Sequence, residues 1–463
     1  MRDMNYKKND IYTINIENLG NNGEGIGRID GYTLFVKDAL PGDVIKARIT
    51  KANKNYGYAR VEEIITPSED RTEPVCEQAA RCGGCQIQTL SYEAQLEFKQ
   101  RLVENNLKRI GKIENYHMNP IIGMEQPYNY RNKAQFPVGE DKDGNIKIGF
   151  YAGRTHSIIE SDVCHIGIDE NRNVVYLVKQ HMQKYGIKAY NEQTGKGIVR
   201  HILIRKAFAT GQIMVCIVIN ADNLPHHVQL TEELLKIQGM TSISLNINKE
   251  KGNVILGRKV INLYGDGYIT DMIGDVKFRI SPLAFYQVNP AQTNKLYSTA
   301  LKYAGLTGNE TVWDLYCGIG TISLFLAKNA KSVKGVEIIP QAIDNARDNA
   351  VINDIQNAEF FVGKAEEVLP AYYDEQKKNG IKATADVIVV DPPRKGCDMT
   401  LLDTIVNMTP KKVVYVSCDS ATLARDAGYL EKHGYKVVEV QPVDMFPHTV
   451  HVEVVTCLQR VNS

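Results

Sequence analysis

The chain has 463 residues, of which 43% are hydrophobic and 24% charged, and its formal net charge at pH 7 is +1. This length predicts roughly two to four domains, and the composition excludes a disordered or fibrous protein. No apolar run approaches the roughly 20 residues that span a bilayer, and the N-terminus lacks the apolar core of a signal peptide. We therefore expect a cytoplasmic protein without a membrane partner or an obligate protein partner. In that compartment clustered cysteines indicate metal binding or catalysis.

The first predicted domain, residues 5–64, consists of short strands separated by glycine-rich turns. Apolar and polar residues alternate, and turns fall near Gly23, Gly31 and Gly42, a pattern that predicts a small β-barrel. The stretch "VIKARITKANKNYGYARV" contains basic residues and no acidic one, with Tyr56 and Tyr58 between them. Basic side chains can follow RNA phosphates, and tyrosines can stack on unpaired bases.

The second predicted domain, residues 70–280, begins with a group of cysteines. The run "VCEQAARCGGCQ" contains Cys76, Cys82 and Cys85, and Cys164 in "SDVCHIG" is a remote candidate for a fourth ligand. Four thiolates can hold either an iron–sulfur cluster or tetrahedral zinc, and the spacing leaves both open. The alternative of four unrelated reduced cysteines is disfavoured by the adjacent glycines at 83 and 84, which suit a tight turn.

Mixed strands and helices fill the rest of this second domain. A helix predicted at about 91–110, with Ser91 as its N-cap, either belongs to it or packs on the third domain. Two further basic stretches, "YRNKAQF" with Arg131 and Lys133 and "GKGIVRHILIRKAF", contain no acidic residue. Any one such run is usually a solvated face, but three on a near-neutral chain favour a localised RNA surface.

The third predicted domain, residues 281–463, alternates strands and helices as in a doubly wound sheet. In "TVWDLYCGIGTISLFLA" a strand ending near Tyr316 is followed by a glycine turn and a helix. The next strand ends at Glu337, 19 residues beyond Gly318, where an acid suits hydrogen bonding to ribose hydroxyls. The turn lacks a third glycine, so a nicotinamide site or a purely structural turn remains an alternative.

A rigid exit from the sheet follows in "ADVIVVDPPRKGCD". Two prolines cannot continue a ladder, so Asp391 faces the crevice where such sheets bind ligands. In methyltransferases acting on exocyclic amino groups, an aromatic residue follows the two prolines. Arg394 stands there instead, which argues against an amino-group target, while a structural Pro-Pro turn is the other reading.

Cys418 ends the following strand, in "VVYVSCDSATLARD", rather than lying within its apolar run. A thiolate there can add to C6 of a pyrimidine and make C5 a carbon nucleophile, so we expect the site to lower the thiol pKa. The C5 proton must later leave, which requires a base. Glu453 in "HTVHVEVV" is the candidate for this base. The alternatives are a buried structural cysteine and a solvated edge-strand glutamate.

Taken together, "SPLAFYQVNP", "DLYCGIGT", "DPPRKG", "VSCDSATLARD" and "HTVHVEVV" make the chain resemble the RNA uracil-5-methyltransferase family over essentially its whole length. The resemblance implies an OB-like TRAM β-barrel, a central α/β RNA-binding domain with an iron–sulfur site, and a C-terminal Rossmann-like class I methyltransferase domain. It makes Cys418 the nucleophile and Glu453 the proton-abstracting base. It assigns S-adenosylmethionine, the methyl donor, to Gln287, Tyr316, Glu337 and Asp391. It leaves the contacts of Thr321 and Lys364 open.

The cysteine run is most like that of the family's iron–sulfur members. The resemblance therefore implies a 4Fe–4S cluster held by Cys76, Cys82, Cys85 and Cys164, and 23S rRNA as the RNA partner, because such members commonly act there. We expect a flipped uridine to become 5-methyluridine. Transfer RNA is the alternative substrate. Rival classes are an inactive iron–sulfur RNA-binding protein and a methyltransferase for cytosine C5 or an amino group.

Overall fold

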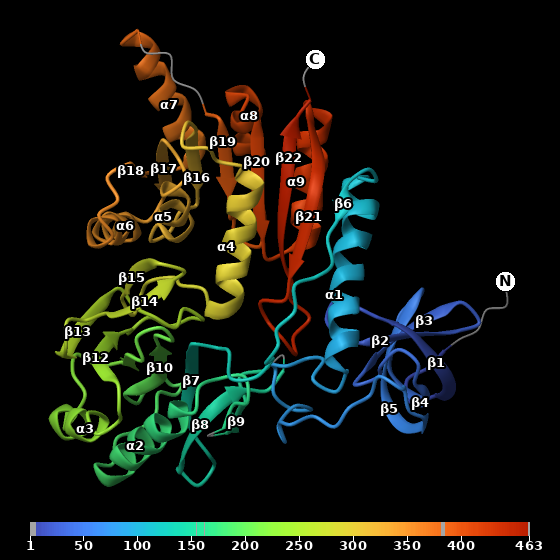
Figure 1. Ribbon diagram of the computed structural model, residues 1–463. Helices are drawn as coiled ribbons and strands as arrows, with labels where there is room; N and C mark the ends of the chain where they lie inside the picture. The colour runs from blue at the N-terminus through green and yellow to red at the C-terminus, as the bar shows by residue number, and fades with distance from the viewer. Residues whose placement is uncertain (1–5, 154, 162, 381–384, 462–463) are drawn as a thin grey trace.

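The computed structural model describes residues 6–153, 155–161, 163–380 and 385–461 (Figure 1). The predicted outer domain limits, positions 5 and 463, lie outside these residues. The barrel, in blue, and the central sheet, in green, lie apart, and α1 rises between them toward the C-terminal sheet, in orange and red. Within the described residues, none of the helices is both long enough and apolar enough to cross a membrane.

The N-terminal strands close into a barrel, as predicted, in the order β1-β2-β3-β5-β4. Alternation sets this arrangement, because every second side chain points inward, and Leu34, Val36 and Ile45 are fully buried. Gly27 allows two strands to approach, since a Cβ there would lie 2.6 Å from the Asn15 carbonyl oxygen. The strands are β1 (Ile11–Leu19), β2 (Gly25–Ile29), β3 (Tyr32–Lys37), β4 (Val44–Ala52) and β5 (Tyr56–Thr66).

The segment after the barrel crosses to the C-terminal sheet. Val103 and Leu107 bury their side chains with Leu423 and Ala427 of α9 in one apolar cluster. The short strand β6 then pairs in parallel with β21 at the sheet edge. Although this segment precedes the central domain in sequence, it packs as part of the C-terminal unit. Its elements are α1 (Tyr92–Asn106), the π-helical turn η1 (Leu107–Gly111) and β6 (His117–Met118).

The central domain is built on a seven-stranded sheet in the order β13-β12-β11-β10-β7-β8-β9. Strand β11 is apolar throughout and β10 is buried along nearly its whole length, because both faces of the sheet are covered there. Ile202 and Ile204 pack with Val174 and Val178 of α2, whereas Leu203 packs into the core shared with the C-terminal domain. The elements are β7 (Lys133–Glu140), β8 (Ile146–Tyr151), β9 (Ile158–Glu160), α2 (Glu170–Lys184), β10 (Val199–Lys206), β11 (Ile213–Ile219), α3 (His227–Leu234), β12 (Met240–Ile247) and β13 (Lys259–Tyr264), followed by the hairpin of β14 (Ile269–Ile273) and β15 (Val276–Ile280).

The C-terminal sheet has eight strands in the order β18-β17-β16-β19-β20-β22-β21-β6. Strands β16 to β20 run in parallel, while β22 is antiparallel to both of its neighbours. The doubly wound sheet predicted from sequence is therefore confirmed. Its elements are α4 (Pro290–Ala304), β16 (Thr311–Leu315), α5 (Thr321–Ala327), β17 (Ser332–Glu337), α6 (Pro340–Ile352), β18 (Ala358–Val362), α7 (Ala365–Lys378), β19 (Val387–Val390), α8 (Met399–Met408), β20 (Lys412–Ser417), α9 (Ser420–Lys432), β21 (Tyr435–Val443) and β22 (Glu453–Arg460).

Candidate active site

A cavity of about 1310 Å³ lies where the C-terminal sheet, the central domain and the cysteine-bearing segment meet. Parallel strands end at the same edge of a sheet, so the residues that follow β16, β17, β19 and β20 come together there. The cavity is lined by every residue that the sequence predicts for catalysis, for S-adenosylmethionine or for metal binding: Gln287, Tyr316, Glu337, Asp391, Cys418, Glu453 and the four cysteines 76, 82, 85 and 164. Thr321 and Lys364, whose roles were open, line it as well.

The turn after β16 presents backbone to the cavity. Tyr316 has a φ of +70°, which a non-glycine residue rarely adopts, and Gly320 follows at +81°. A Cβ on Gly320 would lie 3.2 Å from Ala346 Cβ and Phe360 Cζ, so glycine also keeps the turn against α6. The carboxylate of Glu337 closes the turn. Its two oxygens accept hydrogen bonds from the backbone N–H of Gly318 at 3.3 Å and of Ile339 at 3.0 Å.

Buried acids surround the next part of the cavity. Asp314 is fully buried, and burial raises the pKa of its carboxyl to about 7, although the Ser323 hydroxyl donates to it at 2.5 Å. Burial likewise raises the pKa of Asp391, which follows β19. The hydroxyl of Thr321 is hydrogen-bonded at 3.0 Å to that of Tyr297. A cationic ligand is favoured here, because it would allow these carboxyls to ionise.

Cys418 lies between β20 and α9, half-buried. Asp419 is the N-cap of α9, and its Oδ1 accepts hydrogen bonds from the backbone N–H of Ala421 at 2.9 Å and of Thr422 at 3.1 Å. The expectation that the site lowers the thiol pKa is wrong. Burial, followed by the negative charges of Glu453 and Asp391, raises the pKa of Cys418 to about 11, although Arg394 opposes the rise.

Glu453 is the first residue of β22, an internal strand, and only 3% of its surface is exposed. It is therefore not a solvated edge-strand charge. Burial first and Asp391 second raise the pKa of its carboxyl, while Arg394 acts in the opposite direction. Among the residues that the structure describes, its Oε2 has no hydrogen-bond partner. A buried carboxyl with a vacant acceptor facing a cavity can receive a proton from a bound molecule.

Side chains of α9 fix the loop that carries Arg394. The Thr422 hydroxyl donates to the Arg394 carbonyl oxygen at 3.2 Å, and Arg425 donates to the carbonyl oxygen of Cys397 at 3.0 Å. The fully buried Asp426 accepts from the backbone N–H of Cys397 at 2.8 Å. The sequence motif that follows Cys418 therefore binds the loop after β19 to the helix after β20.

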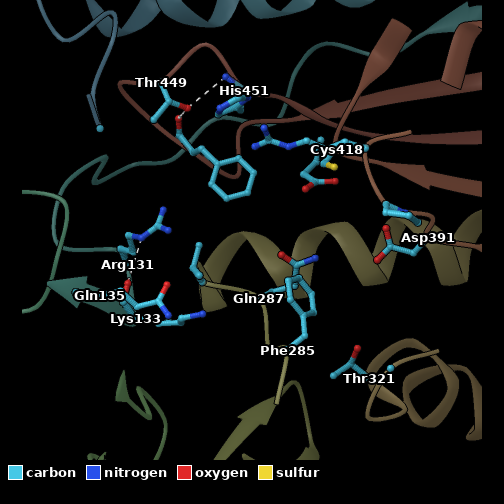
Figure 2. Close-up of a pocket in the computed structure, with 18 of the residues that line it drawn as sticks. Arg131, Lys133, Gln135, Phe285, Gln287, Thr321, Asp391, Cys418, Thr449 and His451 are labelled. Carbon is cyan, nitrogen blue, oxygen red and sulfur yellow. Dashed lines mark hydrogen bonds between the residues drawn. The ribbon is translucent and has the colours of Figure 1, made fainter. Parts of the chain in front are cut away.

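The opposite wall comes from the segment before α4. Figure 2 shows Gln287 and Phe285 rising toward the wall that carries Cys418 and Asp391. The segment is held by the central domain, since Asn132 Nδ2 donates to the Gln287 carbonyl oxygen at 3.0 Å and Arg205 Nη2 to that of Ala284 at 2.5 Å. An aromatic face, an amide, acids and a thiol thus surround one space large enough for a nucleotide and a cofactor.

Comparison with known proteins identifies this arrangement. A family model described as "tRNA (Uracil-5-)-methyltransferase" matches residues 91–461, and a TRAM-domain model matches residues 7–61. The chain belongs to the RNA (uracil-5-)-methyltransferase family. Relatives include uncharacterised RNA methyltransferases of Clostridium acetobutylicum, 54% identical over 99% of this chain and 98% of that protein, and of Halalkalibacterium halodurans, 50% identical over 98% of both.

A solved structure resembles the whole enzyme. The tRNA (uracil-54, C5)-methyltransferase of Pyrococcus abyssi, in complex with S-adenosyl-L-homocysteine, superimposes with a TM-score of 0.76 and 28% identity, covering 96% of this chain and all of that one. The family resemblance, the TRAM barrel and the class I methyltransferase domain expected from sequence are therefore confirmed. So is the coarse activity, S-adenosylmethionine-dependent methylation of RNA uracil at C5.

Cys76, Cys82, Cys85 and Cys164 all lie at the cavity wall. Burial raises the pKa of the Cys85 thiol to about 12, with contributions from Cys164, Cys82 and Cys76, so the four thiols act on one another electrostatically. The segment that contains Cys76, Cys82 and Cys85 is held to the central domain by an isolated antiparallel β-bridge between the backbones of Cys82 and Ala152. However, no group of three or more His, Cys, Asp or Glu side chains within the described ranges has metal-binding geometry.

The basic stretch at residues 195–208 does not contribute the surface we expected. Arg200, His201 and Arg205 are buried, because β10 is a middle strand covered on both faces. Lys206 is ion-paired with Glu170. Two acids that directly follow the barrel stretch also neutralise part of it, because Arg48 on β4 pairs with Glu62 on β5, and Lys46 pairs with Glu63. A run without acids in sequence is thus not a cationic surface when the neighbouring strand supplies them.

Two cationic or aromatic groups keep their access to RNA. On the barrel, Phe35, Tyr56 and Tyr58 form an aromatic group with ring centroids 5.8–5.9 Å apart, and both tyrosines are exposed. In the cavity, Arg131 and Lys133 lie along the wall across from Thr321 in Figure 2. Burial, followed by the positive charges of Arg205 and Arg131, lowers the pKa of Lys133 to about 7.

Sequence reasoning missed Phe285 as a residue of the cavity. Phe285 has 69% of its surface exposed, unusual for a phenylalanine, and it lies two positions before Gln287 on the same extended segment. A spacing of two places side chains on one side of an extended chain, and this spacing was the available signal. The same spacing predicts that His451 and Glu453 share one face, and both line the cavity.

Proposed function

We propose that the enzyme transfers a methyl group from S-adenosylmethionine to C5 of specific uridines in 23S rRNA through a covalent Cys418–uracil adduct. The observation that carries this proposal is that Cys418, Asp391 and Glu453 converge on one cavity with the glycine turn, where Glu453 Oε2 has no hydrogen-bond partner among the described residues. In this proposal the turn with Tyr316, Glu337, Gln287 and Asp391 binds the cofactor, and Glu337 accepts hydrogen bonds from the ribose hydroxyls.

The proposed reaction consists of addition of the thiolate, methyl transfer, and proton abstraction with elimination of the thiolate. The Cys418 thiol loses its proton to solvent, and Sγ bonds to C6 of the flipped uracil while the C5–C6 double bond becomes an enolate. C5 then takes the methyl group, and the methyl–sulfur bond of the cofactor breaks to leave S-adenosylhomocysteine. Glu453 accepts the C5 proton, and the returning electron pair restores the double bond as the Sγ–C6 bond breaks.

The raised thiol pKa has a consequence for this order of events. The positive charge of Arg394 favours the Cys418 thiolate, whereas burial and the carboxylates of Glu453, Asp391 and Asp419 oppose it. A bound sulfonium cation adds positive charge beside Asp391, so the proposal places thiol activation after cofactor binding. The free enzyme therefore keeps its nucleophile protonated and unreactive.

The choice of ribosomal RNA rests on the cysteine pattern, and the solved tRNA methyltransferase structure favours the alternative, transfer RNA. Mapping 5-methyluridine in both RNAs from cells that lack the protein separates them. Loss from 23S rRNA alone supports the proposal, whereas loss from transfer RNA alone replaces it with the alternative. In vitro, Cys418→Ala should bind S-adenosylmethionine without turnover, and RNA containing 5-fluorouridine should trap a conjugate through Cys418. Retained turnover by that variant contradicts the proposed nucleophile.

We also propose that Cys76, Cys82, Cys85 and Cys164 hold a 4Fe–4S cluster. Three observations support this proposal. The four cysteines line one cavity, and three of them act electrostatically on the thiol of Cys85. The Gly84 N–H also donates a hydrogen bond to Cys82 Sγ at 3.4 Å, as is common around thiolate ligands. When bound, the cluster would cross-link the segment to the central domain; the methyl transfer requires no electron from it. Anaerobic purification should give iron and sulfide in a ratio near that of the cluster, and stoichiometric zinc instead would refute the assignment.

A further inference from the structure

The loop between β21 and β22, residues 444–452, forms part of the cavity wall and leads directly into Glu453. Phe446, Thr449 and His451 line the cavity from this loop. It contains no helix or strand, and His448 in its middle has a φ of +68°, a conformation that costs a non-glycine residue energy. Such a segment keeps one shape only if contacts outside it impose that shape.

A buried ion pair between Lys99 of α1 and Asp444 fixes the conformation at the start of this β21–β22 loop. Lys99 Nζ donates to Asp444 Oδ1 at 2.5 Å and to the carbonyl oxygen of Phe446 at 3.0 Å. The Tyr92 hydroxyl donates to Asp444 Oδ2 at 2.8 Å. The side chains of Lys99 and Asp444 are both 0% exposed. These partners are 345 positions apart in sequence, so only the fold brings them together.

The same helix face holds the strained residue. The His448 backbone N–H donates to Gln95 Oε1 at 2.8 Å, and the His448 carbonyl oxygen accepts from the Ile87 N–H at 3.1 Å. Tyr128 stacks on the His448 ring with centroids 4.4 Å apart. Tyr92, Gln95 and Lys99 are spaced three and four residues apart, which places them on one face of α1. One side of a helix therefore holds two points of the loop.

We propose that Lys99 is a positioning residue for proton abstraction: through Asp444 and the Phe446 carbonyl it fixes the β21–β22 loop so that Glu453 reaches the C5 proton. This inference rests on the proposed function. A buried lysine–carboxylate pair is a weak source of stability compared with an apolar pair of similar volume, so its presence beside a catalytic loop calls for another role. A base must lie within hydrogen-bond reach of its proton, and a misplacement of about 1 Å can cost about a hundredfold in rate.

The test separates methyl transfer from proton loss. The variants are Lys99→Met and the double variant Lys99→Met/Asp444→Leu, which leaves no unpaired buried charge and decides the question if the single variant fails to fold. The matched control is Lys108→Met, an exposed lysine at the end of the same segment. Single-turnover assays with labelled S-adenosylmethionine measure methyl transfer, and RNA tritiated at uridine C5 measures proton release.

We expect both Lys99 variants to transfer methyl within about twofold of the wild-type rate and to release tritium at least about tenfold more slowly, so that a methylated protein–RNA adduct accumulates. Lys108→Met should behave as wild type. An equal fall in both rates, or no change in either, overturns the inference. The Glu453→Gln variant distinguishes a failure of the positioning role of Lys99 from a failure of the proposed function. If it accumulates adduct and the Lys99 variants do not, the positioning role fails alone; if neither it nor the wild type forms an adduct, the proposed function fails.

Discussion

The reactivity of Cys418 toward iodoacetamide in the free enzyme is the sharpest consequence of the site. Burial together with Glu453 and Asp391 raises its pKa from 9.0 to about 11. At pH 8 an ordinary thiol with a pKa of 9.0 is about one-tenth thiolate, whereas Cys418 should be about one-thousandth thiolate, roughly a hundredfold less. A more basic thiolate is also a better nucleophile, by about six- to tenfold over this interval. Cys418 should therefore alkylate about tenfold more slowly than an ordinary exposed cysteine.

The dependence on pH is more diagnostic than the absolute rate. Between pH 9 and pH 10 the thiolate fraction rises about ninefold for a pKa of 11 but less than about twofold for a pKa of 9.0. The assay is mass spectrometry of the peptide that contains Cys418 after timed exposure to iodoacetamide, which separates it from the other eight cysteines. Cys418→Ser identifies the correct peptide.

Two substitutions test the physical causes. Glu453→Gln removes a negative charge that favours the thiol, so the plateau of the rate should move to lower pH. Arg394→Met removes the opposing positive charge, so the plateau should move to higher pH. A midpoint of the rate at pH 9 or below in the wild type, unchanged in both variants, would refute the conclusion that burial and nearby carboxylates keep the nucleophile protonated.

Other predictions concern the base, the RNA, the cofactor and the fold. Glu453→Gln should accumulate a methylated protein–RNA adduct on denaturing gels, because the proton stays on C5; product release at the wild-type rate would contradict its role. Tyr56→Ala/Tyr58→Ala should raise KM for RNA about five- to a hundredfold and leave kcat unchanged, since stacking contributes about 1–3 kcal/mol per base; a fall in kcat alone would point elsewhere. Glu337→Ala should weaken S-adenosylmethionine binding at least about tenfold in calorimetry, through loss of a charged acceptor and of the turn contacts it makes; equal affinity would remove it from the cofactor site. Asp426→Ala should lower the free energy of unfolding by about 3 kcal/mol in urea titrations, because the Tyr415 hydroxyl and the Cys397 N–H lose a buried acceptor, whereas Tyr415→Phe should cost about 1 kcal/mol; equal losses would show that the carboxylate is not the centre of this network.

Local sequence patterns were sufficient to predict the site residues that lie at the ends of parallel strands. Each parallel strand is a short apolar run, and the residues chosen at the strand ends, Glu337, Asp391 and Cys418, share one cavity. The reason is geometrical, because the carboxyl ends of parallel strands meet at one sheet edge whatever the helices between them contain. The barrel followed from alternation for a similar reason, since a period of two places one set of side chains inside.

Local sequence patterns gave wrong predictions where residues distant in sequence determine the burial and the charge around a side chain. The basic stretch around Arg200 and Arg205 looked like a surface, but β10 is covered by α2 on one face and by the C-terminal core on the other. The thiol of Cys418 was expected to be acidic, yet burial first, and then carboxylates that include Glu453 of β22 and Asp391 after β19, outweigh the effect of Arg394 on its pKa. Charge and burial at a point are sums over neighbours, and the neighbours here are far apart in sequence.

The amino-acid sequence by itself determined the order of strands and helices, the chemistry at the strand ends and the family to which those motifs belong, because each depends on periodicity or on residues a few positions apart. Only the tertiary structure decided that α1 belongs with the C-terminal sheet, that Lys99 reaches Asp444, and that Glu453 is buried beside Cys418. Those facts depend on which surfaces pack together. A buried charge finds its partner wherever the fold provides one, not where the chain is contiguous.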